Sequence, residues 1–308
     1  MLVSSMDILK EYPVRKSKNQ KEAFRQDVKA YFSRHGYEAK EEKGSFGAVN
    51  LIAGDPEKAK YLVTAHYDTC ARMVLPNFIT PCNPLIYWSY QIGLVLLIAI
   101  IAIAAGVLVG LLWPESRKQV ALLTYWAILV LMIFGPANPS NVNDNTSGVI
   151  TLLEIARTLP ENQREKVCFV LFDLEEAGLI GSASYRKKHK KASDGQLVLN
   201  LDCVGEGDHI RLFPTKKLKK DKKKISSLYK GCGYFGPKSL IVQEKGFYIY
   251  PSDQANFPYG IGICALNQKK KLLYLGRIHT PRDTILDETN VNLLRAAITT
   301  LISSDAAQ

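Results

Sequence analysis

The 308-residue sequence lacks three features that would place it in a specialised class of protein. It has no Cys-x-x-Cys pair, because its six cysteines are scattered along the chain at Cys70, Cys82, Cys168, Cys203, Cys232 and Cys264. Residues 1–7 contain no basic segment followed by an apolar run, so no secretory signal peptide is predicted. No internal repeat is found. These absences exclude a disulfide framework and a repeat array, and they favour free thiols in a reducing compartment.

One long stretch also lacks charge, since no charged residue follows Arg72 until Glu115. Within it, residues 85–113 read LIYWSYQIGLVLLIAIIAIAAGVLVGLLW, which exceeds the ~20 apolar residues that cross a bilayer core of about 30 Å. A second apolar run covers residues 120–134. Buried core helices are the alternative interpretation of both runs. Because one span alone would leave the two halves of the chain on opposite sides of the bilayer, we predict a transmembrane helical hairpin over residues 85–135.

The overall composition is otherwise that of a folded globular protein. Hydrophobic residues make up 47% and charged residues 22% of the chain, which excludes a disordered or collagen-like protein. The mean hydropathy of -0.05 averages a polar part with the apolar runs and so conceals them. The length suits one α/β domain with an insertion. We therefore expect residues 1–84 and 136–308 to form one domain around the inserted hairpin.

Strand and helix patterns alternate along both parts of that domain. Short apolar runs predict strands at residues 60–65, 166–172, 196–201 and 262–266. Amphipathic patterns predict helices at residues 19–35, 148–159, 178–188 and 289–303. Such alternation predicts a three-layer αβα sandwich with a mostly parallel central sheet.

Residue types that bind metals recur where these strands end. They lie in five segments: His66 and Asp68 in TAHYDT, Asp144 in NDNTSG, Glu175 and Glu176 in FDLEEAG, Asp202 in NLDCVG, and His279 in IHTPRDT. Each segment alone has a simpler explanation, such as an ion pair, a solvated turn or a cap. Open α/β sheets, however, place their sites at the carboxyl ends of the strands. Five such segments together therefore indicate a shared site.

The five segments together resemble the di-zinc aminopeptidases of metallopeptidase family twenty-eight, the leucyl aminopeptidase-like zinc exopeptidases, which also include glutaminyl cyclase relatives. The matching pieces HYD, NDNTSG, FDLEEAGLIGS, NLDCVG and HTPRDT extend from about residue 60 to the C-terminal region. A short loop normally joins the first two pieces, whereas about 75 residues separate Asp68 from Asp144 here. The resemblance implies a zinc-exopeptidase-like fold, a peptide substrate and hydrolysis of N-terminal peptide bonds.

The resemblance also implies a role for each matching residue. Five would bind two Zn²⁺ ions, the first held by His66 and Asp202, the second by Glu176 and His279, and both bridged by Asp144. Glu175 would be the general base that activates a water shared by the metals, and Asp68 would orient His66. Imidazole and carboxylate groups are ordinary zinc ligands, and a bridging carboxylate suits metals about 3.5–4 Å apart.

A later segment, YPSDQANF, is similar to the family's Ser-Asp element. The resemblance assigns Ser252 and Asp253 to the substrate pocket, although Gln254 stands where a histidine is common. A plain turn is an equally good interpretation of this segment.

The net charge of +11 includes two Lys-rich segments, KKLKKDKKK at residues 216–224 and RKKHKK at residues 186–191. No aromatic stacking platform or nucleic-acid motif accompanies them, so no nucleic acid is expected as a partner. A solvated loop is the simplest interpretation. Attraction to anionic lipid headgroups is the next, and it is favoured by the predicted membrane segment.

The charge distribution also predicts an orientation. Both flanks of a two-span hairpin must lie on the same side of the bilayer, and they carry nearly all Lys and Arg, whereas the link offers only Arg117 and Lys118. The positive-inside rule therefore places the catalytic domain of an integral membrane protein in the cytoplasm.

Two other functions compete with the aminopeptidase. A glutaminyl cyclase-like transferase shares the fold, but the intact Asn143-Asp144-Asn145 favours the peptidase. A non-catalytic membrane protein that retains the fold would be indicated by lost ligands, and each expected ligand is present in the sequence.

Overall fold

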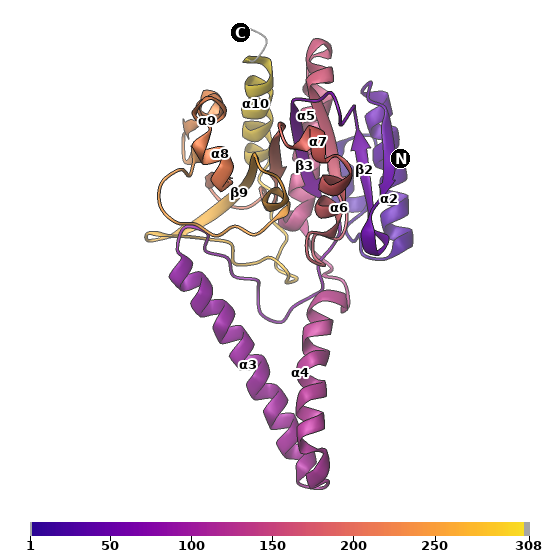
Figure 1. Ribbon diagram of the computed structural model, residues 1–308, viewed down its shortest axis with the longest axis vertical. Helices are drawn as coiled ribbons and strands as arrows, with labels where there is room; N and C mark the ends of the chain where they lie inside the picture. Colours follow the sequence, from indigo (N-terminus) through magenta and orange to yellow (C-terminus); the bar gives the residue numbers. More distant parts are fainter. Residues whose placement is uncertain (1, 305–308) are drawn as a thin grey trace.

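A computed structural model describes residues 2–304, within which ten strands form one mixed sheet flanked by helices (Figure 1). The strands are β1 (Ala39–Lys43), β2 (Val49–Ala53), β3 (Tyr61–His66), β4 (Val167–Phe172), β5 (Leu197–Leu201), β6 (His209–Pro214), β7 (Gly233–Phe235), β8 (Lys238–Val242), β9 (Gly260–Lys269) and β10 (Leu272–Tyr274). Their order is β1-β2-β4-β3-β5-β9-β6-β8-β7, with β10 paired to β9.

The centre of the sheet is parallel and its flanks are mixed. Strands β4, β3, β5 and β9 are parallel neighbours. Pairing becomes antiparallel on both sides, between β2 and β4 and between β6 and β9. The expectation of a mostly parallel sheet is therefore wrong for the whole sheet and holds for the four central strands. The flanking strands escaped prediction because several are short or polar: β1 reads AKEEK and buries little of its surface.

Helices cover both faces of this sheet. On one face lie α2 (Lys18–Arg34), α5 (Ser147–Thr158) and α10 (Glu288–Ser304), which share a core with Val63 and Leu199. On the other face α6 (Ile180–Lys188) contributes Tyr185 to a smaller core that includes Leu62 and Val198. Because successive strand residues point to opposite faces, Leu62 and Val63 enter different cores. The predicted helices agree with α2, α5, α6 and α10 to within two residues at each end.

The remaining short helices are α1 (Ile8–Glu11), α7 (Lys190–Ser193), α8 (Lys216–Lys220) and α9 (Lys222–Leu228). Figure 1 places α8 and α9, which contain the Lys-rich residues 216–224, in the upper part of the molecule, away from the long helices α3 and α4. If α3 and α4 cross a bilayer, its headgroups lie at their base and not beside these lysines. Attraction of residues 216–224 to lipid therefore stays a prediction that this arrangement does not favour.

Two long apolar helices, α3 (Pro84–Gly110) and α4 (Arg117–Phe134), project from the globular part (Figure 1). By length and composition, Pro84–Gly110 and Pro114–Phe134 are both able to cross a membrane. At 1.5 Å per residue, the 27 residues of α3 span about 40 Å. Buried residues of α3 are Ile98, Ala102 and Gly106, and none of the described residues of α4 is buried. Neither helix therefore belongs to the core of the globular part.

The two helices meet closely near the tip of the hairpin. A Cβ added to Gly106 would lie 2.4 Å from the carbonyl oxygen of Arg117 and 2.9 Å from the Cβ of Ala121. A Cβ at Gly110 would lie 3.1 Å from the Cβ of Arg117. Small residues at this spacing allow two helix backbones to approach each other. From this contact the helices diverge toward the globular part, as Figure 1 shows.

Replacing Gly106 by Leu should therefore push α3 and α4 apart by roughly 2 Å or more, toward the 8–10 Å separation of helices with bulky interfaces. Gly93→Leu is the matched control, because a Cβ at Gly93 meets nothing within 4 Å. The separation is measured between spin labels at positions 108 and 122, with Cys82 and Cys232 replaced by Ser. The same distance distribution in both Leu variants would contradict the close contact at Gly106.

Candidate metal centre

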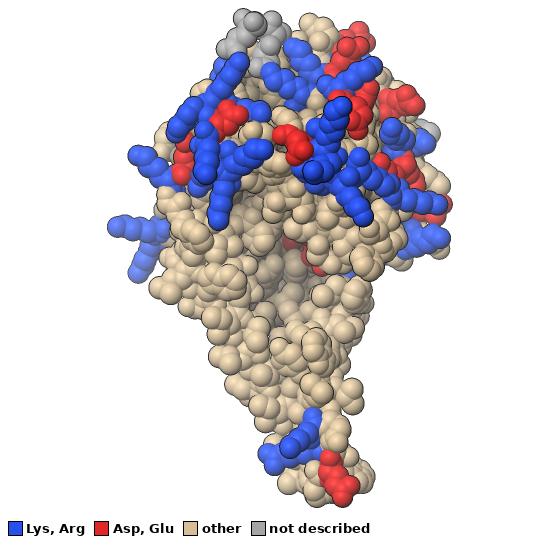
Figure 2. Space-filling view, in the orientation of Figure 1, with Lys and Arg blue, Asp and Glu red and all other residues tan. Residues whose placement is uncertain are grey.

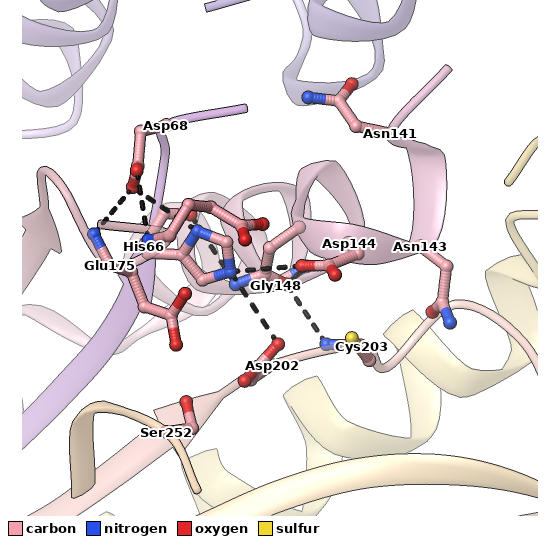
Figure 3. A network of polar contacts seen from close by, with 12 residues as sticks. His66, Asp68, Asn141, Asn143, Asp144, Gly148, Glu175, Asp202, Cys203 and Ser252 are labelled. Carbon is pink, nitrogen blue, oxygen red and sulfur yellow. Dashed lines mark hydrogen bonds and ion pairs between the residues drawn. The ribbon is translucent and has the colours of Figure 1, made fainter. Parts of the chain in front are cut away.

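The side chains that the sequence pointed to converge at the carboxyl ends of the central strands (Figure 3). His66 is the last residue of β3, Asp202 directly follows β5, and Glu175 lies in the turn after β4. The register explains this convergence, because His66 pairs with Phe172 and Thr64 pairs with Asn200, so the three strands end at one edge.

Asp144 lies at the centre of the cluster, between two histidines. Its Oδ1 is 3.2 Å from Nε2 of His66, and its Oδ2 is 3.2 Å from Nε2 of His279. Around His66 the other close carboxylate is Asp202, with Oδ1 3.7 Å from Nε2. Around His279 it is Glu176, with Oε2 3.3 Å from Nε2. The structure thus brings all five predicted ligand residues together in two groups that share Asp144.

The separations around each histidine are those of atoms that can share a metal ion. Ligand atoms at about 2.0–2.1 Å from one zinc ion are separated from each other by roughly 3.3–3.4 Å. The four nitrogen–oxygen distances, from 3.2 to 3.7 Å, lie near that value. His66, Asp144 and Asp202 each offer a ligand atom within 4.8 Å of the other two. Imidazole and carboxylate groups in this spacing are a donor set that zinc accepts.

The charges of the cluster also favour the binding of cations. Burial raises the pKa of Glu176 well above its usual range, and the negative charge of Asp144 adds to this effect. Burial likewise raises the pKa of Glu175, assisted by the charges of Glu176 and Asp253 and opposed by His66. Carboxylates this crowded favour protons or cations beside them. Divalent metal ions would supply the missing positive charge.

The two histidines counter part of this repulsion. Burial alone would raise the pKa of Asp144, but hydrogen bonds with His279 and His66 hold it well below its usual range. Burial would lower the pKa of His66, yet the charge of Glu175 and hydrogen bonds with Asp144 and Asp202 raise it well above its usual value. Hydrogen bonds with the two imidazoles thus stabilise the ionised form of Asp144.

Asp68 lies behind His66 and also fixes the turn after β4. Its Oδ1 is 3.5 Å from Nδ1 of His66. Its two carboxylate oxygens accept hydrogen bonds from the backbone N–H groups of Glu175 and Glu176, at 3.0 and 3.2 Å. Burial would raise the pKa of Asp68, but His66, Lys21 and the Glu175 amide lower it. One carboxylate thus fixes the backbone of Glu175 and Glu176 and lies beside the His66 ring.

The asparagines on either side of Asp144 hold its turn in place, a function that the sequence motif did not reveal. Oδ1 of Asn143 accepts from the backbone N–H of Gly205 at 2.7 Å. Oδ1 of Asn145 accepts from the N–H of Cys203 at 3.2 Å, and its Nδ2 donates to the carbonyl of Leu201 at 2.9 Å. Both asparagines therefore tie the Asp144 turn to the segment that carries Asp202.

Asp283 is a second residue that sequence reasoning missed, although it belongs to the HTPRDT segment. It is fully buried and accepts from the backbone N–H groups of Asn143 at 2.7 Å and Asp144 at 3.0 Å. Burial and the nearby charge of Asp144 raise the pKa of Asp283 to about 7. Since Asp283 follows His279 by four residues, it links the loop of one ligand to the backbone of another.

Arg15 had no sequence signal at all. It is fully buried, and its guanidinium donates to the carbonyls of Tyr67 at 2.6 Å and Tyr12 at 2.7 Å and to Oγ1 of Thr146 at 3.0 Å. It therefore joins the segment after β3 to the turn that holds Asp144. Only the folded chain brings these segments together.

Ser252 and Asp253 lie deeper than a substrate pocket requires. Both are fully buried, and Oγ of Ser252 accepts from Nδ2 of Asn200 at 2.9 Å, beside Asp202 (Figure 3). Burial raises the pKa of Asp253 to about 7. The charge of His66 acts to lower this pKa, and the charges of Asp68 and Asp202 act to raise it. Their burial favours a role in supporting the cluster over direct contact with a substrate.

Comparison with known proteins supplies a family for this arrangement. Residues 132–303, more than half of the chain, match the sequence model of Peptidase family M28. The aminopeptidase YwaD of Bacillus subtilis (strain 168) is 32% identical over 101 residues, which make up 32% of this chain and 21% of that protein. The chain therefore aligns with about a fifth of the length of this relative. The family match begins inside α4, so it includes Asp144 but not His66.

Solved structures extend the similarity of fold across the hairpin insertion. A glutaminyl cyclase from Bacteroides thetaiotaomicron has a TM-score of 0.58 at 16% sequence identity. The superposed region covers 97% of this chain and 93% of the cyclase chain. The LapA aminopeptidase of Legionella pneumophila has a TM-score of 0.58 at 14% sequence identity. The superposed region covers 99% of this chain and 70% of the LapA chain. At such low identity these likenesses show the fold alone.

Replacing Asp283 by Ala should destabilise the site without removing a predicted ligand. The loss of a buried acceptor for two amides should lower the free energy of unfolding by about 2–4 kcal/mol. Zinc affinity should fall about 10–100-fold, as for other groups that orient ligands. Asp221→Ala is the control, because Asp221 accepts one amide at the start of α9 and its loss should cost about 1 kcal/mol. Equal zinc affinity in the two variants, measured by competition with a chelating dye, would contradict the role of Asp283.

Proposed function

Because the chain belongs to peptidase family M28, we propose that it is a membrane-anchored, zinc-dependent aminopeptidase that removes residues from the N-terminus of peptides. The observation that carries this proposal is the position of Asp144. Its two carboxylate oxygens face different histidines at the same distance, 3.2 Å, which is the arrangement expected of a carboxylate shared by two metal ions.

The remaining ligands divide between two metal positions. His66 and Asp202 would hold one zinc ion, and Glu176 and His279 the other. When bound, such a metal pair supplies Lewis acidity that polarises a carbonyl and lowers the pKa of water. Asp68 keeps the His66 ring oriented, and Asp283 keeps the Asp144 backbone in place.

Glu175 is the proposed general base. His66, Glu175 and Glu176 each have a ligand-type atom within 4.8 Å of the other two, so the Glu175 carboxylate lies within reach of the reacting groups. It takes one proton from the attacking water as the new C–O bond forms. It then delivers that proton to the amine that leaves as the C–N bond breaks. Burial raises the pKa of Glu175, which is the direction that favours the return of the proton to the leaving amine.

The proposed membrane anchor is the hairpin of α3 and α4. Its exposed apolar side chains would meet lipid, and Trp88 at the base and Trp113 at the tip would lie at the two interfaces. Because both ends of the hairpin join the same globular part, that part lies on one side of the bilayer. The shortage of Lys and Arg in the link, compared with the flanks, supports the cytoplasmic side.

A glutaminyl cyclase-like transferase is the second candidate, because a glutaminyl cyclase and an aminopeptidase resemble this fold equally, with TM-scores of 0.58. The peptidase is favoured because the intact motif Asn143-Asp144-Asn145 is typical of it. Both asparagines form hydrogen bonds to the segment that follows Asp202, and these bonds hold Asp144 in position. A non-catalytic protein is disfavoured by the complete set of ligand residues around Asp144.

The detergent-purified full-length protein should release free N-terminal amino acids from a peptide library. Activity should disappear with a metal chelator and return with Zn²⁺, because the carboxylate-rich cluster needs cations to work. Release of ammonia and formation of pyroglutamate from N-terminal glutamine peptides would instead identify the cyclase. Absence of both reactions with zinc bound would favour the non-catalytic alternative.

Two substitutions separate the base from the bridge. Glu175→Gln keeps the side-chain shape but removes the proton acceptor, so turnover should fall by about 10²–10⁴-fold while the zinc content stays the same. Asp144→Ala should lower the zinc content as well as the rate. For both variants, the zinc content is measured by elemental analysis and the turnover by peptide hydrolysis. Full activity of the Gln variant would reject Glu175 as base, and an undiminished zinc content of the Ala variant would reject the bridge.

A further inference from the structure

We propose that the substrate is a membrane-embedded peptide whose apolar segment lies between α3 and α4 while its N-terminus enters the metal centre from the bilayer side. The proposal rests on the proposed function, since it names the substrate class of the same site. It depends on how the hairpin is attached, on the gap between its helices and on the distribution of charge.

The hairpin is attached at the rim of the metal centre. The first linker (residues 70–83) and the second linker (residues 135–141) are joined by a bridge between Ala71 and Ala137. In the first linker, the N–H of Met73 donates to the carbonyl of His279 at 2.8 Å. In the second, Nδ2 of Asn138 donates to the carbonyl of Thr280 at 3.0 Å. Both linkers thus contact the loop that carries a proposed zinc ligand.

The hairpin is open on the side of the site and closed at its tip. The buried residues of α3 lie in its second half, at Ile98, Ala102 and Gly106, and Gly106 closely approaches Arg117 of α4. At the base, the exposed apolar side chains include Leu85, which is 78% exposed, and Trp88, which is 54% exposed. Figure 1 shows the resulting V shape, with its wide end toward the globular part. The wide end of the V meets the hollow that the space-filling view in Figure 2 shows between the globular part and the base of the hairpin.

The surface around this gap is apolar and the centre above it is acidic. From residue 73 to residue 143 the only charged residues are Glu115, Arg117 and Lys118, all at the tip, in the turn between the helices and at the start of α4. Figure 2 shows a hollow above the base of the hairpin with acidic side chains inside it, and uncharged atoms from there to the tip. In the first linker, Val74 is 98% exposed.

This distribution of charge matches one kind of occupant. An apolar peptide segment suits the uncharged gap, and the α-ammonium group at its N-terminus is attracted by the carboxylates above. Lipid acyl chains would match the gap but would bring no group for the acidic centre. A soluble peptide would match the centre but would gain nothing from exposed Val74 and Leu85. The peptide that combines both properties is therefore the favoured substrate.

Three peptides with the same N-terminal six residues test the proposal on the full-length protein in zinc-supplied proteoliposomes. The first ends in a soluble tail. The second is lipid-anchored through a long hydrophilic spacer, so it is concentrated at the membrane without an adjacent apolar segment. The third continues directly into about 20 apolar residues, enough to span the bilayer. We expect initial rates at least tenfold higher for the third peptide than for the second at equal density in the membrane.

Paired variants locate the effect on the hairpin. Val74→Gln with Leu85→Gln alters the first linker and the base of α3, whereas Leu111→Gln with Leu112→Gln alters the tip, where the leucines are similarly exposed, at 75% and 73%. The ratio of rates for the third and second peptides should fall at least threefold in the first pair and stay the same in the second. Hydrolysis of the soluble peptide normalises each preparation for active protein.

The outcomes separate this proposal from the proposed function. Equal rates for the second and third peptides would overturn it, because concentration at the membrane would then explain any preference. Equal ratios in both variant pairs would also overturn it. Cleavage of the soluble peptide in either case would leave the aminopeptidase function standing. Failure to cleave any of the three peptides would reject the aminopeptidase function, and this proposal with it.

Discussion

The close approach of several buried carboxylates around Asp144 is the constraint on which the rest of the site depends. Such groups repel one another unless positive charge lies between them, and burial makes each unpaired charge more unfavourable. Part of the compensation comes from His66 and His279, which lie 3.2 Å from Asp144 on opposite sides and lower its pKa. Metal binding would supply the rest, so the stability of this edge of the sheet should be coupled to metal binding. The centre is therefore both the proposed site of chemistry and a source of strain that the surrounding fold must hold.

Hydrogen bonds to backbone N–H groups hold the turns of the centre in place. Asp68 and Asp283 each accept from two consecutive backbone N–H groups, and each thereby fixes a turn that carries predicted ligands. Residues Cys203 and His279 adopt a positive φ, of 57° and 63°, which non-glycine residues adopt only where the surroundings impose it. The parallel centre of the sheet provides the frame for these turns, because it brings the ends of β3, β4 and β5 to one edge.

The same frame explains how a hairpin fits between two proposed ligands. Asp68 and Asp144 are far apart in sequence, but the bridge between Ala71 and Ala137 brings the two ends of the insertion together. The two ends of the insertion therefore leave the globular part side by side, and the fold of that part is similar to those of the two solved structures. The insertion also sets the position of the apolar helices, which begin and end at the rim of the site. A membrane that contains these helices therefore lies directly beside the site.

Sequence alone identified the side chains that meet at the centre and the two apolar helices, because residue chemistry at strand ends and uninterrupted apolar length are local properties. It could not identify Arg15 or Asp283 as supports, since Arg15 reaches the Asp144 turn through Thr146 and Asp283 through Asn143, each more than a hundred residues away. It also missed the mixed flanks of the sheet, where short polar strands such as β1 carry no apolar pattern. The side on which the site opens was decided by tertiary structure, because it depends on how two linkers pack against the His279 loop.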